Sequence, residues 1–433
     1  MLPGPNVGSF VPAGTAVSEP VLRCAGCGTV ASIRDRWPWA CPERRAGDDI
    51  DHVLVPEFAP AVIPSAHENP FVRYRGRLCC YQLWRGAGRD DQSFVALVES
   101  LDAAIARVAG RGFHITPLAH FPTLDVAVGA RVWVKDETNN VAGSHKGRHL
   151  FGVLLLLRVL EELGRPQPGE LVIASCGNAA RAAAVMAAAA GRHLTAFVPA
   201  DVDQGVASQL AALGASVERC GRDGQPGDPC YRRFRLAVAE GAIAFSCQGP
   251  DNGSAIEGAS TIGWEVTEAR PDGVDRVVIQ VGGGALATAL VRGLGLGAQK
   301  AIIDTVQTAS AHPLERALSR LRRDPADAAR HRSRYMWPWE TEPASVARGI
   351  LDDETYDWLA VAQAMLATGG TAVVASEAAL IEANQLARAT TGIDVDETGS
   401  AGLAGLLMLA RSGQVPAGSD ALVIFTGGPA GLA

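Results

Sequence analysis

The sequence contains no apolar run that is long enough to cross a bilayer. The most apolar helical stretches, residues 150–160 and 179–191, either contain arginines or are too short to span one. The first fourteen residues lack the basic start and apolar core of a signal peptide. We therefore expect a cytoplasmic protein that does not have a membrane as a partner.

The sequence also lacks an excess of positive charge, because it has 39 Lys and Arg but 46 Asp and Glu, for a net charge of −7. Binding to nucleic acid requires a clustered basic surface, so we expect no nucleic-acid partner. Cysteine is sparse as well. Nine cysteines in 433 residues, without an export signal, are better interpreted as free thiols than as a disulfide framework.

What the sequence does contain is an alternation of two kinds of segment. From about residue 115, short β-branched runs alternate with Ala- and Leu-rich helical runs, which predicts mainly parallel sheets covered by helices. We predict strands at 131–137, 170–175, 193–199, 215–220, 242–247, 274–281, 300–307 and 421–426, and helices at 147–163, 178–190, 203–214, 230–241, 256–269, 285–295 and 399–413. Residues 309–346 break the alternation and predict a long loop with some helix, whereas residues up to about 51 show no periodicity and predict an irregular appendage.

Ligands of open parallel sheets bind beyond the carboxyl ends of the strands, so the loops there are the candidates for a site. Lys146 follows Gly-Ser-His after one such strand and opens a helix. The partial positive charge of a helix N-terminus lowers the pKa of a lysine amine, which suits a Schiff-base nucleophile. Considered alone, a lysine at a helix start is ordinarily a solvated surface residue.

A second loop carries Ser175, Cys176, Gly177 and Asn178 at the start of a helix of small residues. Its hydroxyl and exposed N–H groups predict a carboxylate receptor, although a simple helix cap explains the same residues. Arg181 lies one turn further on. Its guanidinium either reaches solvent along its stem or pairs with an acidic group of the substrate.

A third loop has the glycines Gly282, Gly283 and Gly284 followed by Ala285 and Leu286, and it predicts an anion site made of backbone N–H groups. The same glycines with Ala287 also fit a dinucleotide fingerprint, for which Asp304 would be the ribose-binding acid. A nicotinamide-dependent oxidoreductase is therefore an alternative.

A fourth loop begins at Thr426, whose hydroxyl either faces a shared site or caps a turn.

Together these loops resemble the fold-type-II pyridoxal-phosphate enzymes of the tryptophan synthase β-like superfamily, and among them the threonine-synthase-like branch. Matching residues of the lysine segment are Lys135, Glu137, Asn140, Gly143, Ser144, Lys146 and Arg148. The other matches are Ser175–Asn178, Gly282–Leu286, the Glu257, Gly258, Thr261 and Ile262 segment, and Thr116–Leu118. The resemblance covers roughly residues 110–430.

The resemblance implies pyridoxal 5'-phosphate as the cofactor and a role for each matching residue. Lys146 would carry the cofactor as a Schiff base and move the α-proton, Asn178 would contact the ring hydroxyl, and Thr426 the pyridine nitrogen. The loop of Gly282, Gly283, Gly284, Ala285 and Leu286 would hold the phosphate. Ser144, Ser175, Cys176 and Gly177 would bind the substrate. Arg181 is a departure from the family pattern, and we expect it to bind an acidic group of the substrate. A neutral hydroxyl at the pyridine nitrogen favours elimination and replacement over transamination.

The reaction implied is β- or γ-elimination or replacement on a small amino acid of the serine, threonine or O-phospho-homoserine type, catalysed by a carbon–oxygen lyase or a synthase. Val141, Ala142, His145 and Gly147 depart from the family pattern, which favours a specialised β-replacement enzyme or a dehydratase over threonine synthase itself. A catalytically idle homologue that binds the cofactor is a further alternative. We expect a homodimer whose chain divides into an appendage at 1–60, a large cofactor domain at 61–145 and 246–433, and a smaller domain at 146–245.

The appendage is similar to the cysteine ribbon of some threonine synthases. Cys24 and Cys27 form one pair of the kind that binds zinc, but Cys41 has no second cysteine beside it. A site with four zinc ligands would need His52 or another group as its fourth ligand. We therefore expect a degenerate ribbon that holds no metal.

Overall fold

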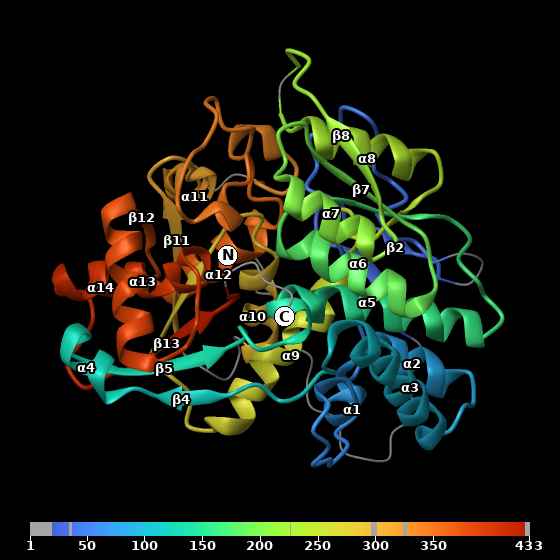
Figure 1. The fold of residues 1–433 in the computed structure, drawn as a ribbon, viewed down its shortest axis with the longest axis horizontal. Coiled ribbons are helices and arrows are strands. Elements are labelled where there is room, and N and C mark those ends of the chain that lie inside the picture. Colours follow the sequence, from blue (N-terminus) through green and yellow to red (C-terminus); the bar gives the residue numbers. More distant parts are fainter. Residues whose placement is uncertain (1–19, 34–36, 226, 296–300, 324–326, 429–433) are drawn as a thin grey trace.

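The computed structural model describes residues 20–33, 37–225, 227–295, 301–323 and 327–428, so residues 1–19 of the predicted appendage lie outside the described part. Two lobes lie side by side, each built around its own sheet (Figure 1). The larger sheet has six strands in the order β12-β11-β10-β13-β5-β4. Its strands are β4 (Leu118–His120), β5 (Arg131–Asp136), β10 (Arg276–Gln280), β11 (Ile302–Thr308), β12 (Ala372–Ala375) and β13 (Asp420–Phe425).

All neighbours in the larger sheet run parallel except β4, which pairs antiparallel with β5 at the edge. Helices cover both faces, and every residue of β10 and β13 is buried accordingly. One face packs against α4 (Pro122–Val128), α13 (Glu377–Thr391) and α14 (Glu397–Arg411). The other face packs against α9 (Ser254–Ala269), α10 (Ala285–Leu294), α11 (Pro313–Arg323) and α12 (Trp358–Thr368).

The smaller sheet is fully parallel, with the order β8-β7-β6-β9. Its strands are β6 (Leu171–Ala174), β7 (Leu194–Pro199), β8 (Ser216–Cys220) and β9 (Ile243–Ala244). The helices α5 (Lys146–Glu162), α6 (Asn178–Ala190) and α7 (Gln204–Ala212) share the core on one face. Val172 and Phe197 point to the opposite face, where α8 (Pro229–Ala239) covers them.

The N-terminal part contains a small antiparallel sheet in the order β2-β1-β3, made of β1 (Val21–Cys24), β2 (Val30–Ala31) and β3 (Leu54–Glu57). The sequence did not predict these strands within the irregular appendage, because strands of two to four residues are too short to show a period. The helices α1 (Pro70–Arg73), α2 (Cys79–Gly86) and α3 (Asp91–Ala109) follow, in a stretch where we predicted no elements.

The division into domains stays a prediction, and the packing bears on it at one point. Helices α1, α2 and α3 belong by sequence to the predicted large domain, yet they share a hydrophobic core with α5 and α6 of the smaller lobe.

The predicted loop at 309–346 contains α11, as expected, and the predicted helix 178–190 coincides with α6. Among the described residues, no helix combines the length and the apolar character needed to cross a membrane.

Candidate active site

Lys146 stands at the junction of the two lobes, where the chain leaves β5 of the larger sheet and enters α5 of the smaller lobe. The connecting loop contains a 3-10 turn, η2 (Val141–Gly143), in which buried Ala142 has φ 58, a left-handed conformation that costs free energy for a residue with a Cβ. The Lys146 side chain is half-buried. Within the described ranges, no carboxylate lies at ion-pair distance from its amine, which leaves the amine available for chemistry.

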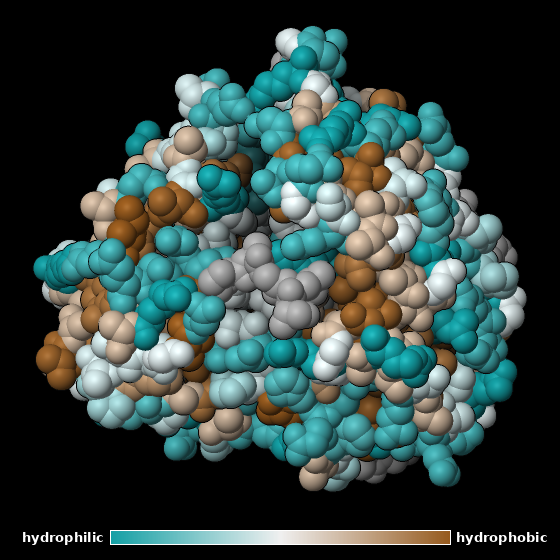
Figure 2. All heavy atoms as spheres, viewed as in Figure 1, coloured by the Kyte–Doolittle hydropathy of each residue, from teal (hydrophilic) through white to brown (hydrophobic). Residues whose placement is uncertain are grey.

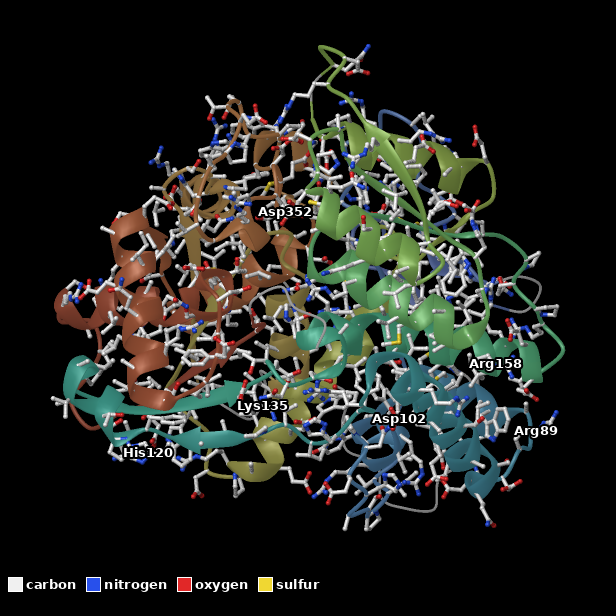
Figure 3. The ribbon with its side chains drawn as sticks, viewed as in Figure 1. Arg89, Asp102, His120, Lys135, Arg158 and Asp352 are labelled. Atoms are coloured by element: carbon white, nitrogen blue, oxygen red, sulfur yellow. The ribbon has the colours of Figure 1, made fainter. Side chains whose placement is uncertain are left out.

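Lys135 lies in the same sequence motif but in a different environment. It is buried, and its Nζ pairs with Glu265 of α9 and donates to the Thr116 carbonyl oxygen at 2.6 Å. Figure 3 shows it between β5 and α9. Burial lowers the pKa of Lys135, while the neighbouring carboxylates oppose that shift. Because its amine is engaged in this ion pair, Lys135 is not available as a second Schiff-base lysine.

A buried ion-pair network fixes the loop that precedes Lys146. Arg148 Nε donates to Glu137 at 2.8 Å and its Nη1 pairs with Glu265 at 2.5 Å, and all three side chains are buried. Arg148 Nη2 also donates to the Thr116 hydroxyl at 3.1 Å. These contacts tie the end of β5, the start of α5 and α9 together, so the position of Lys146 is set by structure on both sides of it.

The end of β13 comes directly beside the lysine loop. The backbone N–H of His145 donates to the Thr426 carbonyl oxygen at 3.0 Å, and Ser144 forms a β-bridge with Gly427. Gln280 Nε2 donates to the buried Thr426 hydroxyl oxygen at 3.1 Å. Since this oxygen already accepts a hydrogen bond, the hydroxyl proton of Thr426 is free to donate to a neighbouring acceptor.

The start of α6 approaches the same place from the smaller lobe. Asn178 Nδ2 is 2.9 Å from the position that a Cβ on Gly427 would take, so only a glycine admits this contact. Arg181 Nη1 lies 3.9 Å from the corresponding point on Gly143. Asn178 and Ser144 both lie against Gly427, and Arg181 lies against Gly143 of the lysine loop.

Ser175, Cys176 and Gly177 form the loop between β6 and α6. The Gly177 N–H donates to the Ser175 hydroxyl at 3.3 Å, and the Ser175 N–H donates to the Phe197 carbonyl oxygen at 3.2 Å. Cys176 and Gly177 are exposed at this position. The loop therefore presents a thiol and backbone N–H groups at the carboxyl end of β6, where a ligand of this sheet would bind.

The loop of Gly282, Gly283 and Gly284 leads from β10 into α10. Gly284 has φ +89 and caps α10, so the N–H groups of the first helical turn point past the end of the sheet without partners inside the helix. The carboxyl of Asp352 lies against this loop, and the Gly283 backbone N–H acts to lower its pKa. Asp357 also packs on the loop, with its Cβ 3.3 Å from the position that a Cβ on Gly284 would take. A Cβ on Gly282 would lie 2.2 Å from Asp352 Oδ2.

Sequence reasoning missed Asp352, because it lies in a segment without periodicity. Burial raises the pKa of its carboxyl to about 6, and the positive charge of Lys146 opposes that shift. Figure 3 shows Asp352 at the boundary of the two lobes, and Figure 2 shows that the surface is hollowed there. Tyr356 lies beside it, with Cδ2 3.1 Å from the point where a Cβ on Gly283 would stand. The only signal for this group is the acidic run DDETYD at 352–357.

These residues fit a phosphorylated aldehyde cofactor. The Lys146 amine has no ion pair with a described carboxylate, and the N–H groups of the glycine loop can donate to an anion. This loop, the Thr426 hydroxyl and the Asn178 amide all follow the carboxyl ends of strands in the two sheets. The alternative of a nicotinamide cofactor does not fit, because Asp304 is buried in an ion pair with Arg276 and accepts the Thr371 N–H at 2.7 Å. This carboxylate is not available to a ribose.

The fold and the site thus define an α/β enzyme that binds a phosphorylated cofactor. The family model described as pyridoxal-phosphate dependent enzyme matches residues 111–427, and the chain belongs to this family. The chain is 30% identical over 213 residues to a serine dehydratase-like protein of Rattus norvegicus, which is 49% of this chain and 62% of that protein. It is 26% identical over 319 residues to a threonine synthase of Mycobacterium tuberculosis, which is 72% of this chain and 80% of that protein.

The fold is similar to that of a maize serine racemase structure, with a TM-score of 0.60 and 19% sequence identity, over 77% of this chain and 94% of that one. The predictions of the fold class and of pyridoxal phosphate as the cofactor are confirmed. The alternative of an oxidoreductase is wrong, because the chain belongs to the pyridoxal-phosphate dependent family.

Proposed function

We propose that this protein is a lyase or synthase that eliminates or replaces a substituent at Cβ or Cγ of a small amino acid carrying a second acidic group. The observation that supports the substrate class is Arg181. Its side chain is only 7% exposed, and among the described residues its guanidinium has no ion pair and no hydrogen bond. The nitrogens of Arg181 are not among the fully buried atoms that lack a partner, so the guanidinium is largely desolvated and still accessible. An anion that binds to it would offset the cost of its partial burial.

The surroundings of Arg181 support an anion from outside the chain. Burial lowers the pKa of Arg181, and the distant Asp396 opposes this shift without forming an ion pair. Burial raises the pKa of Asp396 to about 6. The guanidinium of Arg181 instead lies beside Gly143, in the lysine loop. A phosphate or second carboxylate on the substrate would reach it there, next to the Lys146 amine.

The cofactor would be held by the residues that converge at the lobe junction. Lys146 would bind it covalently, the N–H groups of Gly282–Leu286 its phosphate, Asn178 its ring hydroxyl, and Thr426 its pyridine nitrogen. Ser144 and the Ser175, Cys176 and Gly177 loop would bind the substrate carboxylate. When bound, pyridoxal phosphate supplies an electron sink for the electrons of the Cα–H bond.

The residues of this chain would direct that chemistry toward elimination. Lys146 Nζ would take the proton from Cα of the substrate and deliver it where the leaving group or the product requires one. The Thr426 hydroxyl would donate a hydrogen bond to the pyridine nitrogen without transferring its proton, because a hydroxyl is a far weaker acid than a carboxyl group. The nitrogen would stay neutral, a setting that suits elimination and replacement.

The first experiment tests the lysine. We expect Lys146→Ala to lose the covalent pyridoxyl adduct that borohydride traps, together with turnover, while its thermal midpoint stays close to that of the wild type. Peptide mapping of the reduced protein identifies the modified lysine. Lys135→Met is the matched control from the same motif, and we expect it to keep the adduct on Lys146 but to lose stability. An adduct retained by Lys146→Ala would contradict the assignment, and absence of any adduct in the wild type would favour an idle homologue.

The second experiment tests the acidic group with two substrates that differ only in a phosphate, L-serine and O-phospho-L-serine. We expect Arg181→Lys and Arg181→Ala to lower kcat/KM for the phosphorylated substrate by about 10- to 100-fold, the worth of a charge-assisted hydrogen-bond pair. The value for serine should change little. Arg158→Lys, on the surface of α5, is the control. An unchanged ratio of the two substrates in both Arg181 variants would exclude recognition of an acidic group by this residue.

We also propose that the enzyme acts as a cytoplasmic homodimer. Light scattering of the purified chain measures the oligomeric state, and fractionation of the producing cells measures the location.

A further inference from the structure

The N-terminal ribbon brings four side chains with metal-binding atoms to one point. Cys24 ends β1, Cys27 lies in the turn that follows, Cys41 comes from the next loop, and His52 precedes β3. Their sulfur and nitrogen atoms all lie within 4.8 Å of one another. Cys24, Cys41 and His52 are buried, and Cys27 is half-buried.

The spacing of these atoms is that of ligands around a single small ion. Zinc bonds of about 2.3 Å to sulfur and about 2.0–2.1 Å to nitrogen, arranged as a tetrahedron, require S···S distances of about 3.8 Å and S···N distances of about 3.6 Å. The Cys27 and Cys41 sulfurs are 3.7 Å apart, and the Cys24 sulfur is 3.4 Å from His52 Nδ1. A disulfide requires sulfurs only about 2.0 Å apart.

The second nitrogen of the histidine has the partner that a metal ligand needs. His52 Nε2 lies 3.2 Å from the carboxylate of Asp48. With its proton on Nε2, the ring donates to Asp48 and turns the lone pair of Nδ1 toward the three sulfurs. A histidine that binds a metal is ordinarily oriented by a carboxylate or carbonyl in this way.

We propose that Cys24, Cys27, Cys41 and His52 bind one structural zinc ion, with Asp48 orienting the histidine. The expectation of a ribbon without metal rested on the missing fourth cysteine, and the structure places His52 in that position. Three thiolates and one neutral imidazole form a Cys3His set, which is typical of closed structural zinc sites.

The position of the site in the fold indicates what the ion stabilises. The segment around His52 docks on the loop after α11, where the Asp51 N–H donates to the Ala329 carbonyl oxygen at 2.7 Å and Arg332 pairs with the Asp51 carboxylate at 3.3 Å. On its other side, a Cβ on Gly253 would lie 2.0 Å from the Leu54 carbonyl oxygen. Zinc at His52 therefore holds a strand of the ribbon between two segments of the main body.

The test measures zinc in the full chain by mass spectrometry of the elements, after dialysis under reducing conditions. We expect one equivalent in the wild type and in Cys220→Ser, a matched control whose thiol lies outside the cluster. We expect Cys41→Ser and His52→Ala to lose the ion, and Asp48→Asn to bind it about 10- to 100-fold more weakly. Zinc at one equivalent in Cys41→Ser, or a Cys27–Cys41 disulfide in the alkylated wild-type chain, would overturn the proposal.

Cobalt substitution provides a readout that does not depend on folding of a variant or on activity. Cobalt in place of zinc should give the visible bands of tetrahedral coordination and the near-ultraviolet bands of thiolate ligation. Removal of zinc from the wild type by a chelator should raise hydrogen exchange at 49–54 and 327–333. If the reduced chain takes up neither zinc nor cobalt, there is no site. If chelation leaves exchange unchanged, the ion has no structural role.

Discussion

At the scale of single residues, burial and ionic partners distinguish side chains of the same type that occur in the same sequence motifs. Lys135 and Lys146 stand eleven residues apart in one segment, yet Lys135 is paired with Glu265 and Lys146 is not paired with any described carboxylate. The same difference separates Arg148, which two glutamates hold, from Arg181, which none holds. An opposite charge offsets the cost of burying a charged side chain, and a buried charge without one is a candidate to bind a charged ligand.

Asp357 provides a prediction of pH dependence at this scale. Burial raises the pKa of its carboxyl from 3.8 to about 7, and its carboxylate accepts the Gly249 N–H at 3.0 Å. Between these two pH values the folded state holds a proton that the unfolded chain has released, so stability falls as the pH rises through this window and levels off above it. Asparagine keeps an oxygen for the Gly249 N–H and has no proton to lose.

We therefore expect Asp357→Asn to gain stability relative to the wild type as the pH rises from about 4 to about 7, by up to a few kcal/mol. Urea unfolding of both proteins at a series of pH values measures the difference. A constant difference across this range would show that the Asp357 carboxyl does not titrate in the window that its burial predicts.

At the scale of elements, α9 is the central helix because glycines let two neighbours approach it closely. A Cβ on Gly258 would lie 2.2 Å from the Arg148 carbonyl oxygen of α5, and one on Gly263 would lie 2.6 Å from the Gly293 Cα of α10. In both places the backbone of the neighbouring helix occupies the space that a side chain on α9 would need. The contacts position α5, and with it Lys146, relative to the helix that follows the glycine loop.

We expect Gly263→Val to separate α9 from α10 and to lower the free energy of unfolding by about 1–3 kcal/mol or more, because a rigid backbone cannot yield to the new side chain. The comparison is Gly221→Ala, at an exposed position where a Cβ meets nothing within 4 Å. Denaturant midpoints measure both changes. Equal midpoints for the two variants would contradict close packing at Gly263.

At the scale of the whole molecule, one buried network spans the two lobes. Glu137 and Lys135 come from the end of β5 in the larger sheet, Arg148 from α5 of the smaller lobe, and Glu265 from α9. Each charge in this network has an opposite charge beside it. Removal of one member leaves a buried charge without a partner, a cost that falls on the contact between the lobes.

We expect Arg148→Met to lower the free energy of unfolding by about 3–5 kcal/mol, because Glu137 and Glu265 lose their shared partner. Arg411→Met breaks an exposed ion pair with Glu382 and should leave the unfolding midpoint nearly unchanged. Chemical denaturation followed by fluorescence measures both variants. A loss in Arg148→Met no larger than in the control would show that the network contributes little to stability.

The sequence by itself determined the alternation of strands and helices, because the periods of buried positions are local properties of the chain. It placed α6 at its observed bounds and indicated the lysine loop, the glycine loop and Thr426 from residues that are contiguous in the chain. It also indicated the cofactor, since these motifs occur in the order of a known family.

Only the tertiary structure decided which groups from distant segments meet. Asp352 reaches the glycine loop from a segment without periodicity, and the Gln280 amide reaches the Thr426 hydroxyl from a neighbouring strand. The ribbon shows the reason most directly. His52 lies 28 residues from Cys24 in the sequence and 3.4 Å from it in space. Folding brings such groups together through long-range packing, which no local pattern of residues encodes.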